Sequence, residues 1–554
     1  MQTLTVFLDR RVFLRLCPWL KSLMGVSLLA LLVACGGEEG ATAFDDSGKG
    51  GLYYSYPYDG QQAVPPHAPI VLRFSDPVSL DASNVSLYEC APDARRCDAN
   101  SAVASVALAA PHSSGNGRGV VLAPDVGALK TGTGYSLVLN DLVIDDQRVS
   151  LPNGSLAFRT RIAREGSIRD QVPDPQLAIT RIVPDGDLPL LDFSTVSVRF
   201  NQPLDPKTVK YGDTVNLTSG GEQVPAAVWA KGSALVLDPE ETLIPGQSYS
   251  LLIMPGVKGL AGDGLDSPML KSWVARSTEP RATMVQRAAA ADDCDQPSPS
   301  STSMLTGMAI NCVPVIARLL GDTTVSRQSG DVFAELAYAP NFPEVTPLRI
   351  PRGALLKGDP LKVMIGGQVD AGFDSGEVTV TFLSDATGYL IPNPNSVSPN
   401  APRQLRLNID VAFATEEPRA NGAFTQTLLQ VELVGTAKAN TTTGSLGADA
   451  VGVVEPEVLG VETAYGVLSF HMESYPDQNN APAPQDDMTP PTLQAWQPGE
   501  ATLMQRPGDP VVLNFSEPLD PATVTKSRIT LQENGADIPD SLEQDGAGII
   551  LRRE

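Results

Sequence analysis

Apolar and polar residues alternate with a period of two in many short runs along this 554-residue chain. Such alternation is typical of strands in antiparallel sheets, where one face is buried and the other meets solvent. Turn-forming residues separate the runs, and the chain contains 48 glycines and 47 prolines. Between residues 311 and 480, the only plausible short helix is at residues 313–320. The pattern therefore predicts an all-β protein.

One strand motif occurs three times, at Ile70–Val78, Val196–Asp205 and Val511–Asp520. Each copy alternates up to a phenylalanine that we expect to face inward. Each is then stopped by a proline, which cannot donate to a sheet ladder. Further short strands follow the motif in the same order. The first two copies also share a later leucine, glycine and tyrosine: Leu129, Gly134 and Tyr135, and Leu243, Gly246 and Tyr249.

Strands this short, spaced about ten residues apart, predict a β-sandwich of roughly 100 residues per copy. The pattern resembles the bacterial Ig-like domain of surface-layer proteins, whose signature is a strand that ends Phe-Ser-Glu-Pro-(Leu/Val)-Asp. The resemblance covers residues 53–165 (domain 1), 177–279 (domain 2) and 488–554 (domain 3, partial). It implies extracellular spacing, scaffolding or adhesion, and it carries no shared catalytic residues.

The third copy stops after the strand at residues 548–551, so the strands that would complete its sandwich do not follow. A half sandwich leaves strand edges unpaired and half a core uncovered. Either the sequence is an incomplete version of a longer chain, or another chain supplies the missing strands. We favour the first interpretation.

The region between the second and third copies does not repeat. Residues 280–310 are rich in alanine, proline and serine and read as a linker. Residues 311–480 contain further alternating runs and predict a separate β-rich domain of unclassified family. Because this domain is the unique part of the chain, it is the first place to expect a binding activity.

The N-terminus carries a targeting signal. Basic residues and a short apolar run precede Leu32–Cys35, which resembles a bacterial lipobox. The resemblance implies that residues 1–34 are a lipoprotein signal peptide and that Cys35 is lipidated. Residues 35–52 then form a flexible tether. Gly36 after the cysteine favours the outer membrane. An ordinary secretory signal is the alternative, and a twin-arginine route is open at Arg10 and Arg11.

Charge and cysteine content restrict the partners and the chemistry. The net charge of −24 excludes a nucleic-acid partner for the bulk surface. Four cysteines remain after Cys17 and Cys35, and in an oxidising compartment they predict disulfides. Local pairing is the most economical of the three connectivities: Cys90–Cys97 and Cys294–Cys312. A zinc site is the rival interpretation, but the cysteines lie in distant segments.

The sequence offers little catalytic chemistry. The three histidines lie far apart, and no nucleophile-elbow, zinc-protease or phosphate-loop motif occurs. Acidic loops at Asp145–Asp146 and Asp263–Asp266 can either hold calcium or simply form turns. An aromatic cluster follows the tether, and we expect its exposed rings to cover the edge of domain 1 or to stack on sugars: Tyr53, Tyr54, Tyr56 and Tyr58. We predict no cofactor and no metal.

These observations predict an envelope lipoprotein, anchored in the outer membrane through Cys35, that is not an enzyme. Its role would be that of a scaffold, spacer or adhesin, on either the surface or the periplasmic face. The alternative is a module in residues 311–480 that binds polysaccharide or an envelope protein. An enzyme with unrecognised carboxylates is a third possibility.

Overall fold

The computed structural model describes residues 51–553 except 126, 145, 173, 175, 187, 366–367, 394–401, 441–444, 459–461, 485–488, 500–505 and 507. Nearly all of its regular structure is strand, which confirms the all-β prediction. Within the described residues the α-helices are α2 (Ile168–Gln171) and α3 (Pro418–Phe424). The short 3₁₀ turns are η2 (Pro152–Gly154), η3 (Pro206–Thr208), η4 (Pro299–Ser301), η5 (Arg318–Leu320), η6 (Ala339–Asn341) and η7 (Pro521–Thr523).

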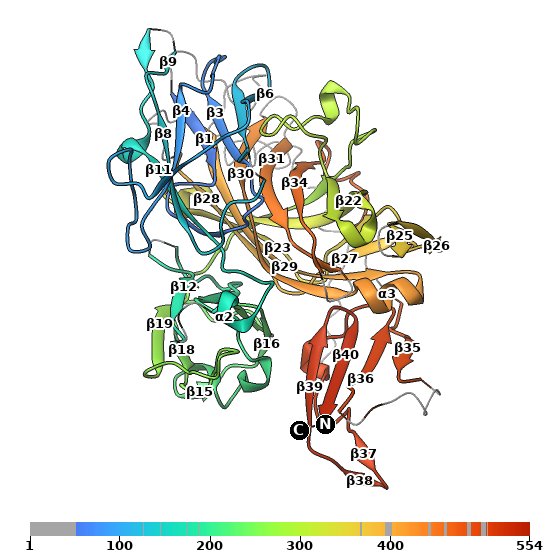
Figure 1. The fold of residues 1–554 in the computed structure, drawn as a ribbon. Helices are drawn as coiled ribbons and strands as arrows, with labels where there is room; N and C mark the ends of the chain where they lie inside the picture. The colour runs from blue at the N-terminus through green and yellow to red at the C-terminus, as the bar shows by residue number, and fades with distance from the viewer. Residues whose placement is uncertain are drawn as a thin grey trace, which may run out of the picture.

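Domain 1 is a sandwich of two sheets (Figure 1). One sheet runs β1 (Leu52–Tyr56), β3 (Ile70–Phe74), β7 (Gly119–Leu122) and β6 (His112–Ser114). The other runs β2 (Gln61–Val64), β11 (Leu156–Thr160), β8 (Gly134–Leu139), β4 (Val85–Glu89) and β5 (Ala104–Val106). A small hairpin joins β9 (Val143–Ile144) to β10 (Gln147–Arg148).

Domain 2 repeats this architecture. Its first sheet runs β12 (Ile179–Val183), β13 (Val196–Phe200), β17 (Ala234–Pro239) and β16 (Ala226–Lys231). Its second runs β15 (Glu222–Gln223), β14 (Val215–Ser219), β18 (Ser248–Ile253) and β19 (Met269–Val274). The tyrosine of the repeat has the same role in both domains, because its hydroxyl accepts a hydrogen bond from a backbone amide five residues upstream. The distance is 3.0 Å from Lys130 N to Tyr135 and 2.8 Å from Ile244 N to Tyr249.

Domain 3 contributes one sheet of the same type, below the central domain in Figure 1. The sheet runs β35 (Leu493–Gln497), β36 (Val511–Phe515), β40 (Gly548–Arg553) and β39 (Asp540–Asp545). The hairpin of β37 (Gln532–Glu533) and β38 (Ala536–Asp537) extends from it. As in the other two domains, the strand that ends in phenylalanine lies inside its sheet.

The central domain is one large antiparallel sheet that closes on itself. Going round the closed part, each strand pairs with the next: β20 (Arg281–Ala288), β34 (Gly466–Ser474), β31 (Ser445–Val454), β30 (Gln426–Asn440), β29 (Arg403–Thr415), β28 (Ala386–Ile391), β23 (Thr346–Ile350) and β22 (Asp322–Ala337), which pairs again with β20. At one end the long strands continue and pair with β21 (Cys312–Ala317), β24 (Leu355–Gly358) and β27 (Val378–Phe382). Two hairpins flank this end: β25 (Lys362–Ile365) with β26 (Val369–Asp374), and β32 (Glu457–Val458) with β33 (Glu462–Thr463).

Strict alternation along the long strands separates an inner face from an outer face. In β29, Leu405, Leu407, Ile409 and Val411 face the enclosed core. In β30 the alternation of inward and outward side chains shifts by one residue at Gln430, which has a φ of 54°. The pairing of β30 with β29 is irregular at the same place, between Ile409 and Val411. Such a bulge turns one extra residue outward. It sends the Gln430 side chain into domain 2, where its Nε2 donates to the carbonyls of Val198 and Leu235.

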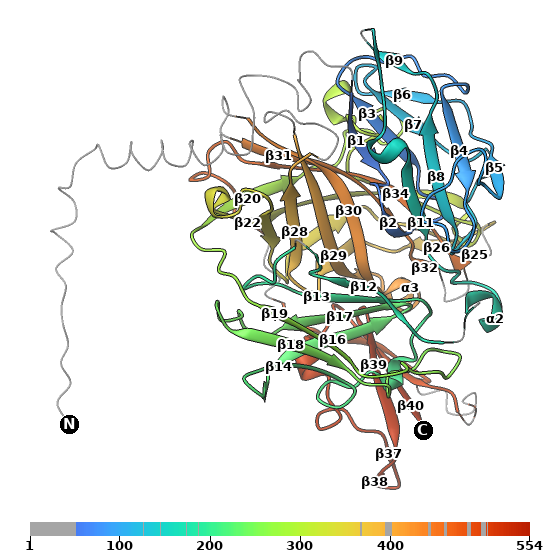
Figure 2. The same ribbon diagram turned by 90° about the vertical axis from the view of Figure 1, so that its left-hand side faces the viewer.

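The Ig-like domains pack directly on the central sheet. The core of domain 1 is continuous with Val434, Val451 and Val453 on the outer face of β30 and β31. Figure 2 shows domain 1 beside these strands and domain 2 below them. The tyrosine cluster lies on and just after β1, the edge strand of a domain 1 sheet, as expected. Its side chains are at most 6% exposed, so our expectation that the rings are exposed is wrong. The hydroxyl of Tyr54 instead donates to the Val434 carbonyl at 2.8 Å.

Two further expectations are corrected in the central domain. Residues 280–310 are not a linker, because Arg281–Ala288 pairs along its whole length with β22 and Leu305 is buried against domain 1. The alanine side chains of residues 280–310 are short and contribute little to a hydrophobic pattern. Pairing with strands distant in the sequence decided the conformation of this segment. Residues 313–320 form a strand and a 3₁₀ turn instead of a helix. The apolar run is short, and short apolar runs are compatible with either structure.

No helix among the described residues is long and apolar enough to cross a membrane.

Candidate functional site

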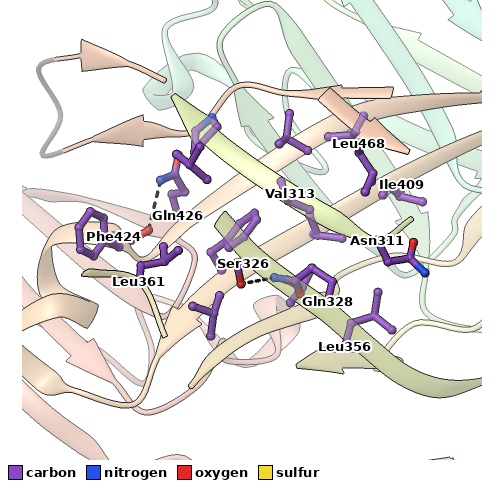
Figure 3. A pocket seen from close by; sticks show the side chains of 18 of the residues that line it. Asn311, Val313, Ser326, Gln328, Leu356, Leu361, Ile409, Phe424, Gln426 and Leu468 are labelled. Atoms are coloured by element: carbon purple, nitrogen blue, oxygen red, sulfur yellow. Dashed lines mark hydrogen bonds between the residues drawn. The ribbon is translucent and has the colours of Figure 1, made fainter. Parts of the chain in front are cut away.

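An apolar cavity of about 100 Å³ lies inside the closed sheet, at the end near α3 (Figure 3). Its wall includes residues of β21, β22, β23, β24, β27, β29, β30, β31 and β34. On β29 they are Leu407, Ile409, Val411, Phe413 and Thr415, which follow one another at every second position. Period-two alternation thus directs one row from each strand into the same space.

A second cavity of about 50 Å³ lies further along the interior. Ile350, Leu407 and Phe470 contribute to the walls of both cavities. The remaining wall of the second cavity is also largely aliphatic and includes Met284 and Met472. Methionine is unbranched and flexible, so it adapts to irregular space. The two cavities are therefore neighbours within one apolar interior.

The end of the larger cavity is covered by α3 and the two hairpins. Phe424 of α3, Leu320 and Val458 belong to one buried cluster over this end. The Gln426 amide joins two parts of the cover: its Nε2 donates to the Phe424 and Glu457 carbonyls, and its Oε1 accepts from Glu457 N. The cover is therefore a packed, hydrogen-bonded structure.

Domain 3 supports this cover through Asn421 of α3. Asn421 is fully buried, and its Oδ1 accepts a hydrogen bond from the backbone N of Thr415 at 3.0 Å. Its Nδ2 donates to the Phe515 carbonyl at 2.7 Å and to Gln494 Oε1 at 2.9 Å, both in domain 3. One side chain thus connects the end of β29, the cover and the third Ig-like sheet.

Among the described residues, six that are polar or charged interrupt the apolar wall of the cavity: Asn311, Ser326, Gln328, Thr415, Gln426 and Glu457. Gln328 Nε2 donates to Ser326 Oγ at 2.9 Å, and Ser326 Oγ donates to the Asp359 carbonyl at 3.0 Å. Gln328 Oε1 and Thr415 Oγ1 are buried and have no hydrogen-bond partner among the described residues. None of these residues was predicted from the sequence, although Thr415 extends the inward row of β29 and is recognisable as a polar residue on an apolar face.

A different, polar cavity of about 290 Å³ lies where domains 1 and 2 meet the central domain. Arg161 forms a two-pronged ion pair with Glu455, with Nε to Oε2 at 2.6 Å and Nη2 to Oε1 at 2.5 Å. Burial would raise the pKa of Glu455, but the positive charges of Arg164 and Arg161 more than offset it and hold the pKa below its ordinary value. Arg161 and Arg164 both form ion pairs with Glu455, so these charges around the cavity neutralise one another. Such pairing is typical of a domain junction.

The predicted site residues fall in separate places. Cys35 lies outside the described residues. The structure contains the two local disulfides, Cys90–Cys97 with Cα atoms 5.4 Å apart and Cys294–Cys312 with Cα atoms 5.9 Å apart. The second disulfide anchors β21 to the segment that covers domain 1.

The histidines lie in different environments. His67 stacks on Tyr465 with ring centroids 3.7 Å apart, and burial lowers its pKa. His471 Nδ1 lies 2.9 Å from Asp449 Oδ1; burial would lower the pKa of His471, but this carboxylate more than offsets burial and raises it. Within the described part of the chain, no group of three or more His, Cys, Asp or Glu side chains could hold a metal ion.

Comparisons with known proteins agree with the repeat architecture. A model of the bacterial Ig-like domain matches residues 176–274, which lie in domain 2. Alkane uptake protein B of Marinobacter nauticus is 33% identical over 565 residues, which is 94% of this chain and 51% of the relative. The chain therefore spans about half the length of this curated relative.

Two solved structures of the surface-layer protein SbsC were also matched, at 12% and 10% identity. Each match covers 74% of this chain and 62% of SbsC, with a TM-score of 0.15.

Proposed function

We propose that this chain is a non-catalytic part of the bacterial cell envelope and that it binds hydrocarbon chains inside the central domain. The observation that carries the proposal is the apolar cavity enclosed by the sheet. It lies in the non-repeated region, where a binding activity was expected. The name of the Marinobacter relative, an alkane uptake protein, supports the same class of ligand.

The lining of the interior is suited to such a ligand. The two cavities together approach the roughly 150 Å³ at which an apolar protein cavity stays dry and binds a small hydrocarbon. Each methylene group that leaves water contributes about 0.8 kcal/mol. A long chain would need more space than the larger cavity provides, so its entry requires the cover of α3 and the hairpins to move.

The packing of the Ig-like domains favours a support role over a spacer role. A spacer needs domains in a string, whereas domains 1, 2 and 3 each bury side chains against the central domain. We therefore propose that the sandwiches hold the closed sheet and its cover in position. Sugar stacking by the tyrosines of domain 1 is weakened, because these side chains are buried.

The proposed location is the outer membrane, with lipid on Cys35 as the anchor. The lipobox-like sequence supports this part of the proposal. Metabolic labelling with palmitate is expected to mark the wild-type protein and to leave Cys35→Ala unlabelled. Labelling of the variant to the same extent would contradict lipidation at this residue. Protease treatment of intact cells would then decide between the surface and periplasmic faces.

The binding proposal is tested by displacement of a fluorescent apolar probe, N-phenyl-1-naphthylamine, from the purified full chain by n-hexadecane. Val380→Phe adds a ring to the cavity wall, and we expect it to weaken displacement at least about tenfold. Val274→Phe is the matched control, because Val274 is 56% exposed on domain 2. Equal hexadecane binding by both variants, with unchanged thermal unfolding, would refute a site in this cavity.

A further inference from the structure

The buried oxygens of the cavity wall identify the chemical class of the ligand more closely. Gln328 is 8% exposed and Thr415 is 3% exposed, and both line the cavity. An acceptor that is buried without a partner costs free energy, because its hydrogen bonds to water are lost on folding and no protein donor replaces them. A ligand that completes its hydrogen bonds recovers that loss, and an unsubstituted alkane cannot.

The orientation of the Gln328 amide follows from its neighbours. Ser326 Oγ uses its hydrogen to bind the Asp359 carbonyl, so it can only accept from Gln328. The amide therefore turns its NH₂ group toward Ser326 and leaves Oε1 as the free end (Figure 3). A free amide oxygen accepts hydrogen bonds and cannot donate. Its partner must carry an O–H or N–H group.

Strand register places the two unpaired oxygens at the same level of the sheet. Gln328 pairs with Gly358, Gly358 with Val378, and Val378 with Thr415, across four neighbouring strands. Gly358 leaves room for the Gln328 side chain, since a Cβ atom built there would overlap the Gln328 amide. Gln328 and Thr415 thus lie at the same height along the cavity, near the end covered by α3 and the hairpins. The apolar residues on the other side of this height lead toward the second cavity.

The charge of the lining excludes an anionic head group. Among the described residues that line the cavity there is no lysine, arginine or histidine, and the only charged residue is Glu457. Burying a carboxylate or phosphate without a cation is costly. A neutral hydroxyl group can donate to Gln328 Oε1 and brings no charge into the cavity.

We infer that the cavity takes an aliphatic chain with a neutral terminal hydroxyl group, a fatty alcohol, whose head lies at the level of Gln328 and Thr415. This inference rests on the proposed function, because it assigns the ligand of the same cavity. The tail would lie along the apolar interior toward Leu407 and the second cavity.

The test compares three ligands of equal chain length on the full-length protein: 1-hexadecanol, n-hexadecane and the methyl ether of the alcohol. The ether can accept a hydrogen bond but cannot donate one. We expect the alcohol to displace the fluorescent probe about tenfold more tightly than either of the others. This series uses the wild-type protein, so it does not depend on the folding of any variant.

Variants then assign the preference to the residue. Gln328→Met keeps the size of the side chain and removes the acceptor, so we expect it to bring the ratio of alcohol affinity to hexadecane affinity close to one. Gln404→Met is the matched control, because Gln404 is fully buried with an unpaired amide in the same sheet but does not line either cavity. The control should keep the wild-type preference.

The outcomes separate this inference from the proposed function. Equal binding of alcohol and alkane by the wild type overturns the inference, since water would then satisfy Gln328, and leaves hydrocarbon binding standing. A preference that survives in Gln328→Met also overturns it. Failure of all three ligands to bind refutes the proposed function itself, and the inference with it.

Discussion

Replacing Asn421 with alanine tests whether domain 3 holds the cover over the cavity. The substitution removes the hydrogen bonds to Thr415 N, the Phe515 carbonyl and Gln494 Oε1. Because Asn421 is completely buried, water cannot readily replace these bonds. The side chain is small, so the cavity left by its removal is a minor effect.

The magnitude follows from these three bonds. A buried hydrogen bond contributes about 1 kcal/mol net, and leaving a buried backbone group without a partner costs more. We expect a local loss of about 3 kcal/mol in the free energy that keeps α3 closed against β29 and domain 3. That loss corresponds to roughly a hundredfold rise in the population of the open cover.

Amide hydrogen exchange is the appropriate assay, because the change is local and need not alter global unfolding. Exchange in residues 415–424 and 511–515 should accelerate by about the same factor, while strands β20 and β34 on the far side stay protected. Entry of the apolar probe should also become faster. Asn341→Ala, at an exposed position of the same domain, is the control. Unchanged exchange in residues 415–424 would refute the idea that domain 3 supports the cover.

Two further predictions concern the domain junctions. Burial, and then the charge of Asp385, raises the pKa of Asp238 to about 7, while the unfolded chain keeps the ordinary value of 3.8. The folded state therefore holds a proton that the unfolded state releases, so stability falls as pH rises from about 4 to about 7, by at most about 4 kcal/mol. Asp238→Asn should flatten this part of the urea-midpoint profile, followed by Trp229 fluorescence, and a slope identical to wild type would contradict the assignment. Separately, Arg161→Ala leaves Glu455 buried with only the more distant Arg164 nearby, and we expect a loss of about 3 kcal/mol, measured as faster proteolysis between domains 1 and 2. Proteolysis at the wild-type rate would show that the pair does not stabilise the junction.

Local features of the sequence were sufficient for the Ig-like domains. Strands that end at Phe74, Phe200 and Phe515 were predicted from alternation and from the proline that follows each motif. Tyr135 and Tyr249 bond to amides five residues away, so the repeat itself contains both partners. These interactions are short-range, and a pattern within one segment records them.

Long-range pairing decided the central domain and its cavity. Arg281–Ala288 became a strand because β22 lies beside it, and Val313 lies in a strand for the same reason. The alternation in β29 and β30 was visible, but whether their apolar rows faced a neighbouring domain or an enclosed space depended on closure of the sheet. Gln328 and Thr415 face one cavity because three strand registers align them. Alternation determines which side chains share a face, whereas only closure of the sheet determines what that face encloses.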